Sequence, residues 1–179
     1  MPVAETARAW TLDDLYALPD DGNKYELIRG ELFVTPAPST DHETILSRLT
    51  RILDQYVAAS DLGFVFHPRA ALRFEGSEAE PDLMVRRKES PDQDWETMPP
   101  PSLLVEVLSA STRRRDRKEK RDFYLDAGVA EYWIVDPETK AIAAIRRGEP
   151  DTLNWETVRW WPKGVAEPLD VVLTELFGN

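Results

Sequence analysis

Residues Pro101–Ser111 read PSLLVEVLSAS, an apolar run with one carboxylate, Glu106, at its centre. Four aliphatic residues flank that carboxylate: Leu104, Val105, Val107 and Leu108. A short run that is apolar on both faces predicts a central strand of a sheet that is covered on both sides. Because glutamate is rarely buried without a partner, Glu106 indicates a functional site; the alternative is an edge strand that turns it to solvent.

A second strand is predicted at residues 81–85, PDLMV, and a long connection separates it from the first. If the two strands pair antiparallel with Arg86 opposite Ser102, then Asp82 falls opposite Glu106. Directly opposed residues share a face with Cβ atoms about 4.5–5.5 Å apart, so the two carboxylates would converge. A shared divalent cation would offset their repulsion, whereas a one-residue slip would turn them to opposite faces. Taken alone, Asp82 could simply begin the strand.

The stretch Arg113–Arg121, RRRDRKEKR, falls in a helix predicted over about residues 111–127. Counting 100° per residue, Lys120 lies on the side of this helix that carries three apolar residues: Phe123, Tyr124 and Ala127. Lys120 should therefore point toward the sheet and serve the site, and Lys118 is the alternative.

The other basic residues of this helix make one surface positive on a protein with a formal net charge of -11. That net charge argues against non-specific coating of nucleic acid, which needs many Lys and Arg contacts with phosphates. Four arginines are nevertheless predicted to bind nucleic acid: Arg113, Arg114, Arg115 and Arg117. Arg114, Arg115 and Lys118 fall mostly outside the apolar side, and the alternative is a solvated helix face with i,i+4 ion pairs.

Apolar spacing also predicts a long helix over residues 41–60, with Asp41 or Thr40 as its N-cap. His42 lies in its first turn on the apolar side. There it either approaches the metal site or caps the packing, and the sequence leaves both alternatives open.

Two short apolar runs, KYELI and ELFVTP, are separated by Arg29 and Gly30, which predicts a β-hairpin. Glu26 and Glu31 flank this turn; Glu31 is kept as a weak candidate near the site, although local reasoning does not choose between them. A short helix is predicted after Thr11. Further strands and an apolar tail are predicted at residues 63–67, 70–74, 132–136, 141–147, 157–161 and 173–177.

A single domain is expected for 179 residues, with its core at about 24–147 and a C-terminal strand and tail at 152–179. Hydrophobic residues make up 42% and charged residues 31%, which is typical of a globular protein. No apolar run approaches the roughly 20 residues that span a bilayer, and no secretion signal is visible. The absence of cysteine excludes disulfides and thiolate metal ligands. The sequence therefore favours a cytoplasmic protein that does not enter a membrane.

Five motifs occur in order between Tyr25 and Pro137: YELIRGEL, a histidine shortly after it, EPDLMV, LLVEVLSASTRRRDRKEK and YLDAGVAEYWIVDP. Together they resemble the Uma-two family, a branch of the restriction-endonuclease-like PD-(D/E)XK superfamily of nucleases. The resemblance implies an α/β fold with a restriction-endonuclease-like core, in which helices flank a mixed β-sheet.

The resemblance also assigns residues to the site. Asp82 takes the place of the superfamily's aspartate and Glu106 that of its acidic partner. The superfamily would place a lysine two positions after the glutamate, where this chain has Leu108. The family resembled supplies the lysine from the next helix, and Lys120 fits that position, with Lys118 as the alternative.

An Asp, a Glu and a Lys together suit metal-assisted hydrolysis of a phosphodiester. Both carboxylates would hold Mg²⁺, with Mn²⁺ as a substitute in vitro, while Lys120 orients the attacking water or stabilises the developing charge. The expected function is a magnesium-dependent endonuclease acting on nucleic acid, expected to be duplex DNA. One alternative is a non-catalytic nucleic-acid- or protein-binding module that keeps this fold, and another is an acidic protein-interaction domain.

A homodimer is expected from the segment NWETVRWW near residues 154–161, because duplex cutters must reach two strands. Its tryptophans, Trp155, Trp160 and Trp161, suit a core or a dimer interface better than a platform for base stacking.

Overall fold

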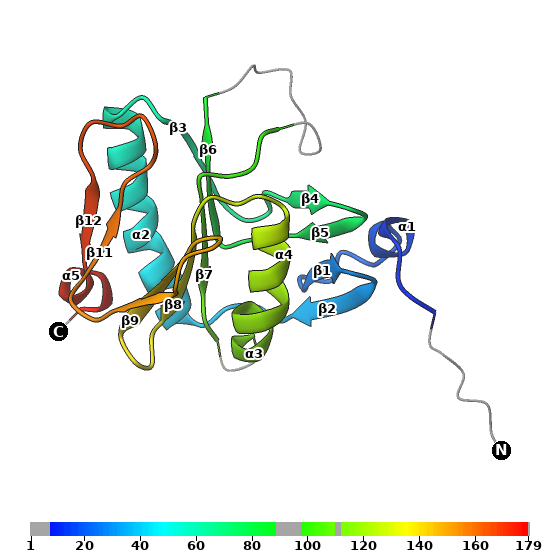
Figure 1. Cartoon of the computed structure of the whole chain (residues 1–179). Helices are drawn as coiled ribbons and strands as arrows, with labels where there is room; N and C mark the ends of the chain where they lie inside the picture. Colours follow the sequence, from blue (N-terminus) through cyan, green and yellow to red (C-terminus); the bar gives the residue numbers. More distant parts are fainter. Residues whose placement is uncertain (1–7, 89–97, 110–111, 179) are drawn as a thin grey trace.

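The computed structural model describes residues 8–88, 98–109 and 112–178. In these ranges the chain forms a six-stranded sheet, a four-stranded sheet and a two-stranded sheet, with helices on both faces of the six-stranded one (Figure 1). The α/β class predicted from the sequence is confirmed. Most of the long connection after Arg86 and the predicted helix start at Ser111 lie outside the described residues.

The six-stranded sheet has the order β10-β9-β8-β7-β6-β3, in which only β7 and β8 are parallel neighbours. Its strands are β3 (Gly63–Phe66), β6 (Leu83–Arg87), β7 (Leu103–Val107), β8 (Tyr132–Asp136), β9 (Ala141–Ile145) and β10 (Thr152–Asn154). The strand that carries Glu106, β7, lies between two neighbours, and all its side chains are buried. The central position predicted for this strand is confirmed.

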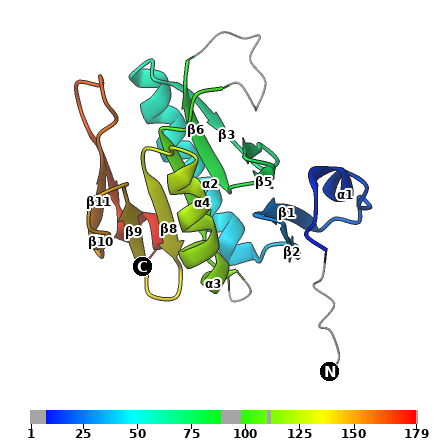
Figure 2. The ribbon, with the colours of Figure 1, turned by 45° about the vertical axis from the view of Figure 1, so that its right-hand side comes forward.

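Alternate residues of the central strands contribute to two cores on opposite faces of this sheet. The first face is covered by α2 (Thr40–Ala59), β11 (Thr157–Trp160), β12 (Leu169–Val172) and α5 (Leu173–Phe177). The second face is covered by α4 (Arg121–Asp126) and by the four-stranded sheet, which extends away from the six-stranded one (Figure 2). Glu106 alternates with Val105 and Val107 along β7, so its side chain lies on the second face together with Leu104.

The four-stranded sheet has the order β2-β1-β5-β4. Its strands are β1 (Lys24–Ile28), β2 (Glu31–Thr35), β4 (Leu72–Phe74) and β5 (Ser77–Ala79). The predicted hairpin between β1 and β2 is confirmed, because Arg29 and Gly30 form a two-residue turn with φ angles of 52° and 81°. Positive φ at both positions is what such a turn requires. The short helix α1 (Leu12–Tyr16) precedes it, capped by Thr11.

The basic segment after β7 is helical but not a regular α-helix. It consists of α3 (Arg113–Arg115), a π-helical turn (Asp116–Lys120) and α4. A π turn contains one residue more than an α turn, which changes the direction of the side chains before it relative to those after it. Lys120 is buried and Lys118 is exposed, as predicted, but Arg115 is also buried. Its predicted place outside the inner face was wrong because the prediction assumed 100° per residue throughout.

Some local features were not predicted from the sequence. Ser39 is the N-cap of α2 in place of Thr40 or Asp41, and its side chain accepts a hydrogen bond from the N–H of His42. Three short strands were not predicted: β5, β10 and β12.

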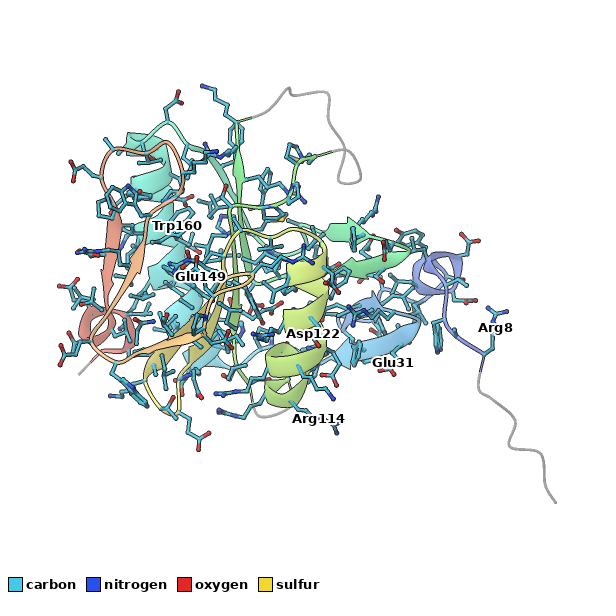
Figure 3. All side chains as sticks on the ribbon, in the orientation of Figure 1. Arg8, Glu31, Arg114, Asp122, Glu149 and Trp160 are labelled. Carbon is cyan, nitrogen blue, oxygen red and sulfur yellow. The ribbon has the colours of Figure 1, made fainter. Side chains whose placement is uncertain are left out.

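The three C-terminal tryptophans have different surroundings. Trp160 is buried in the core beside α2, where its ring lies 5.7 Å from that of Tyr56, and Figure 3 labels it there. Trp155 and Trp161 are exposed. Across the described parts of the chain, no helix combines the length and the apolar character that crossing a membrane would require.

Candidate active site

The two predicted carboxylates lie where β6 and β7 pair. Leu83 is opposite Val105 and Val85 is opposite Leu103, which confirms the predicted register. Asp82 directly precedes β6, and its Oδ2 accepts a 2.8 Å hydrogen bond from the N–H of Val107. Asp82 and Glu106 both line the same cleft.

Asp82 is held between two basic side chains. Its Oδ2 lies 3.0 Å from His42 Nε2, and its Oδ1 lies 3.6 Å from Lys24 Nζ. Burial opposes ionisation of Asp82, but the His42 hydrogen bond and the Lys24 charge outweigh it and lower its pKa to about 2. Asp82 is therefore a carboxylate at neutral pH. Of the two roles left open for His42, the structure shows contact with the site.

Glu106 is held by the helical segment that packs on its face of the sheet. Its Oε1 accepts hydrogen bonds from Lys120 Nζ at 2.7 Å and from the Tyr124 hydroxyl at 2.6 Å. Burial, which leaves Glu106 only 2% exposed, raises its pKa to about 7, although Lys120 acts in the opposite direction. The Lys120 ammonium also contacts a second carboxylate, that of Glu26, so it offsets the cost of burying the Glu106 charge only in part.

Lys120 lies between that second carboxylate, Glu26, and Glu106, with its Nζ 2.7 Å from an oxygen of each. Asp116 Oδ1 is farther from Nζ, at 3.8 Å. The Lys120 side chain is 0% exposed, and it does not line the cleft. Burial disfavours its charged form, but Glu106 and Glu26 outweigh burial and raise the pKa of Lys120. The ammonium therefore stays charged and fixes both carboxylates.

The hairpin contributes Glu26, not Glu31, to the site. Glu26 is fully buried, while Glu31 is exposed beside the turn (Figure 3). Glu31 pairs with Ile28, so its side chain shares a face with that of Glu26 but lies two residue pairs nearer the turn. Two residues along a strand span about 7 Å, which removes Glu31 from the site. Glu31 therefore lies outside the cleft lining, and its role near the site stays a prediction.

Lys24 was not predicted from the sequence as a residue of the site. Alternation along KYELI puts Lys24, Glu26 and Ile28 on one face of β1. Two charged residues on the face that also carries a buried isoleucine are unusual for a hairpin, and this pattern could have revealed both.

The cleft has a volume of about 990 Å³. Its lining includes Asp82, Glu106 and Lys24, together with residues 35–39 before α2 and residues 67–69 after β3. Side chains of both signs line it. A cleft of this size has room for a ligand in contact with the two carboxylates.

The four predicted nucleic-acid-binding arginines have different surroundings. Arg113 and Arg117 both donate to Asp136 Oδ2, at 2.6 Å and 2.9 Å. Arg115 donates to Thr35 Oγ1 at 2.9 Å and lies 3.5 Å from Glu26 Oε2. Arg114 is exposed and points away from the fold (Figure 3). Arg113 and Arg115 line the cleft, whereas Arg114 and Arg117 are exposed outside it.

The donor set fits magnesium or manganese with few protein ligands. Within residues 8–88, 98–109 and 112–178, no three His, Cys, Asp or Glu side chains are grouped so as to hold a metal ion. Asp82 and Glu106 nevertheless present carboxylate oxygens to one cleft, and Mg²⁺ often binds through one or two carboxylates while keeping several waters.

Comparison with known proteins identifies the class. A structure of "a putative nuclease belonging to DUF820" from Anabaena variabilis ATCC 29413 superposes with a TM-score of 0.80 at 20% identity, covering 94% of this chain and 97% of that chain. The fold is therefore restriction-endonuclease-like. Residues 12–176 match the Uma2 family, described as "Putative restriction endonuclease", and the chain belongs to that family. No curated protein matches the chain.

Proposed function

We propose that this protein is a metal-dependent endonuclease that hydrolyses phosphodiester bonds of DNA. The observation that carries the proposal is that Asp82, directly before β6, and Glu106, in the neighbouring strand β7, line one cleft. Membership of the Uma2 family supports a nuclease. Magnesium, with manganese as a substitute, is the proposed cofactor.

Each side chain of the site has a distinct role in this proposal. Asp82 and Glu106 would hold the metal ion, which when bound supplies positive charge against the phosphoryl oxygens and lowers the pKa of water. Lys120 and Tyr124 fix the orientation of Glu106 by donating to its Oε1. Lys120 is enclosed and does not reach the cleft, so we propose that it is a positioning residue. Direct orientation of water by Lys120 stays a prediction.

The wild-type protein is expected to cut duplex DNA with Mg²⁺ and not with EDTA, and to bind Mg²⁺ or Mn²⁺ measurably by calorimetry. Asp82→Ala should lose at least about tenfold in metal affinity, because one of two charged ligands is removed. Metal should also raise the melting temperature of the wild type, since only the folded chain assembles the site.

The control is Asp61→Ala, which removes an exposed carboxylate that pairs with Lys88 outside the cleft. It should bind metal as the wild type does. Equal metal affinity in Asp82→Ala and the wild type would exclude Asp82 as a ligand. DNA binding without cleavage under any divalent cation would favour the non-catalytic module instead.

Arg114→Ala is expected to weaken DNA binding to all sequences alike and to reduce the slope of log K against log salt by up to about one unit. Arg114 is exposed, so its loss should leave the melting temperature nearly unchanged. Arg115→Ala should instead lower the melting temperature, because it breaks contacts with Thr35 and Glu26. Identical salt slopes for Arg114→Ala and wild type would remove Arg114 from the binding surface.

The homodimer and the cytoplasmic location stay predictions.

A further inference from the structure

A second lysine, Lys24, lies beside Asp82, whereas Lys120 lies beside Glu106 and Glu26. It is the first residue of β1, and its Nζ donates to the Glu80 carbonyl at 3.0 Å. The same Nζ lies 3.6 Å from Asp82 Oδ1. Unlike Lys120, the Lys24 side chain is 18% exposed and lines the cleft. A ligand in the cleft can therefore reach it.

The two ammonium groups differ in how fully their N–H groups are used. Lys120 makes two contacts of 2.7 Å with Glu26 and Glu106 and has no surface in the cleft. Among the described residues, Lys24 makes one hydrogen bond, to a carbonyl, and its contact with Asp82 is longer than a hydrogen bond. An ammonium has three donors, so Lys24 keeps capacity for a further acceptor.

We propose that Lys24 is a catalytic residue that contacts the scissile phosphate and that it serves as the counter-ion of Asp82 until a divalent cation takes that carboxylate. This inference rests on the proposed function. Once Asp82 is neutralised by another cation, Lys24 loses the attraction of that carboxylate and like charges repel it, so the hydrogen bond to the Glu80 carbonyl is the contact that remains at its Nζ. Its flexible four-carbon stem lets the ammonium turn toward a phosphodiester in the cleft, in competition with the charges of Glu26 and Glu106.

The two roles of Lys24, counter-ion and phosphate contact, predict separate effects of Lys24→Met on metal affinity and on cleavage rate. Methionine keeps the length and the apolar stem of the side chain. Removing a cation that competes for Asp82 should tighten Mg²⁺ or Mn²⁺ binding in calorimetry by about two- to fivefold. Removing a phosphate contact should slow single-turnover cleavage at saturating enzyme and metal by about a hundredfold. A residue that only neutralises Asp82 would show the first effect without the second.

The experiment measures both quantities for wild type, Lys24→Met, Lys24→Arg and the control Lys88→Met, whose lysine is exposed and lies outside the cleft. Melting curves confirm that each variant is folded. Lys24→Arg keeps the charge and should cut at least about tenfold faster than Lys24→Met, but more slowly than the wild type. If Lys24→Met fails to fold, Lys24→Arg is compared with the wild type alone.

Cleavage by Lys24→Met within about twofold of the wild type would overturn the inference and leave the proposed function intact. Metal binding weakened in Lys24→Met would also overturn it, because Lys24 would then support the metal site. A wild type that shows no metal-dependent cleavage would overturn the proposed function itself and this inference with it. For Lys24→Arg alone, a wild-type rate together with wild-type metal affinity would count against a specific ammonium contact.

Discussion

Lys120→Met is expected to lower the free energy of unfolding by about 3–5 kcal/mol, because it leaves two buried carboxylates without their shared cation. Glu26 and Glu106 each lie 2.7 Å from Lys120 Nζ. A methionine fills similar space, so the loss reports charge rather than a cavity. Chemical denaturation followed by circular dichroism measures it, and cleavage should fall by at least about a hundredfold because Glu106 loses its orientation.

The matched control is Lys118→Met, on the same helical segment but exposed. It should change stability by no more than about 0.5 kcal/mol. Lys120→Met combined with Glu26→Gln should recover part of the lost stability, since one uncompensated charge is removed as well. A Lys120→Met protein as stable as the wild type would show that the buried ion pairs do not form in solution.

Glu106→Gln is expected to abolish cleavage while leaving the fold almost as stable. Glutamine keeps the shape and an oxygen that accepts from Lys120 and Tyr124, but its neutral amide is a poor ligand for Mg²⁺. Single-turnover cleavage should fall by at least about a thousandfold, which is the upper range for loss of one charge-stabilising group. Stability should change by less than about 1 kcal/mol, because one of two negative charges that share an ammonium is removed.

The control for this experiment is Glu131→Gln, another buried glutamate, which directly precedes β8 and does not line the cleft. Its carboxylate accepts from Trp133 and Arg146, so the variant tests burial without touching the site. Glu131→Gln should lose stability and keep its cleavage rate in the folded fraction. Cleavage by Glu106→Gln at more than about a tenth of the wild-type rate would remove Glu106 from the chemistry.

The carboxylate pair could be predicted from the sequence because strands have a fixed period. Once β6 and β7 were recognised, one assumed loop closure set the register of Leu83 with Val105 and hence the position of Asp82. Helical spacing likewise predicted the direction of Lys120, since Phe123 and Tyr124 follow it at three and four residues. Both predictions follow from regular geometry, the first from the pairing of two strands and the second from the spacing of residues along one helix.

The remaining site residues could not be predicted in this way. The alternation along β1 marks Lys24 and Glu26 as unusual, but their place at the site depends on hydrogen bonds with Glu80, more than fifty residues away, which that alternation does not encode. The π-helical turn was missed for a different reason. It is stabilised by what Asp116 and Lys120 contact inside the protein, not by the helix propensity of the residues themselves.

The π-helical turn also limits how this part of the chain can change in length. Removing one residue between Asp116 and Lys120 would restore a regular α-helix. The side chains of α3 would then be rotated by about 100° about the helix axis relative to those of Lys120, Phe123 and Tyr124. The lysine would stay beside Glu106, while Arg115 would swing away from Glu26. Over evolutionary time, insertions and deletions should therefore be rarer here than substitutions at exposed positions such as Lys118.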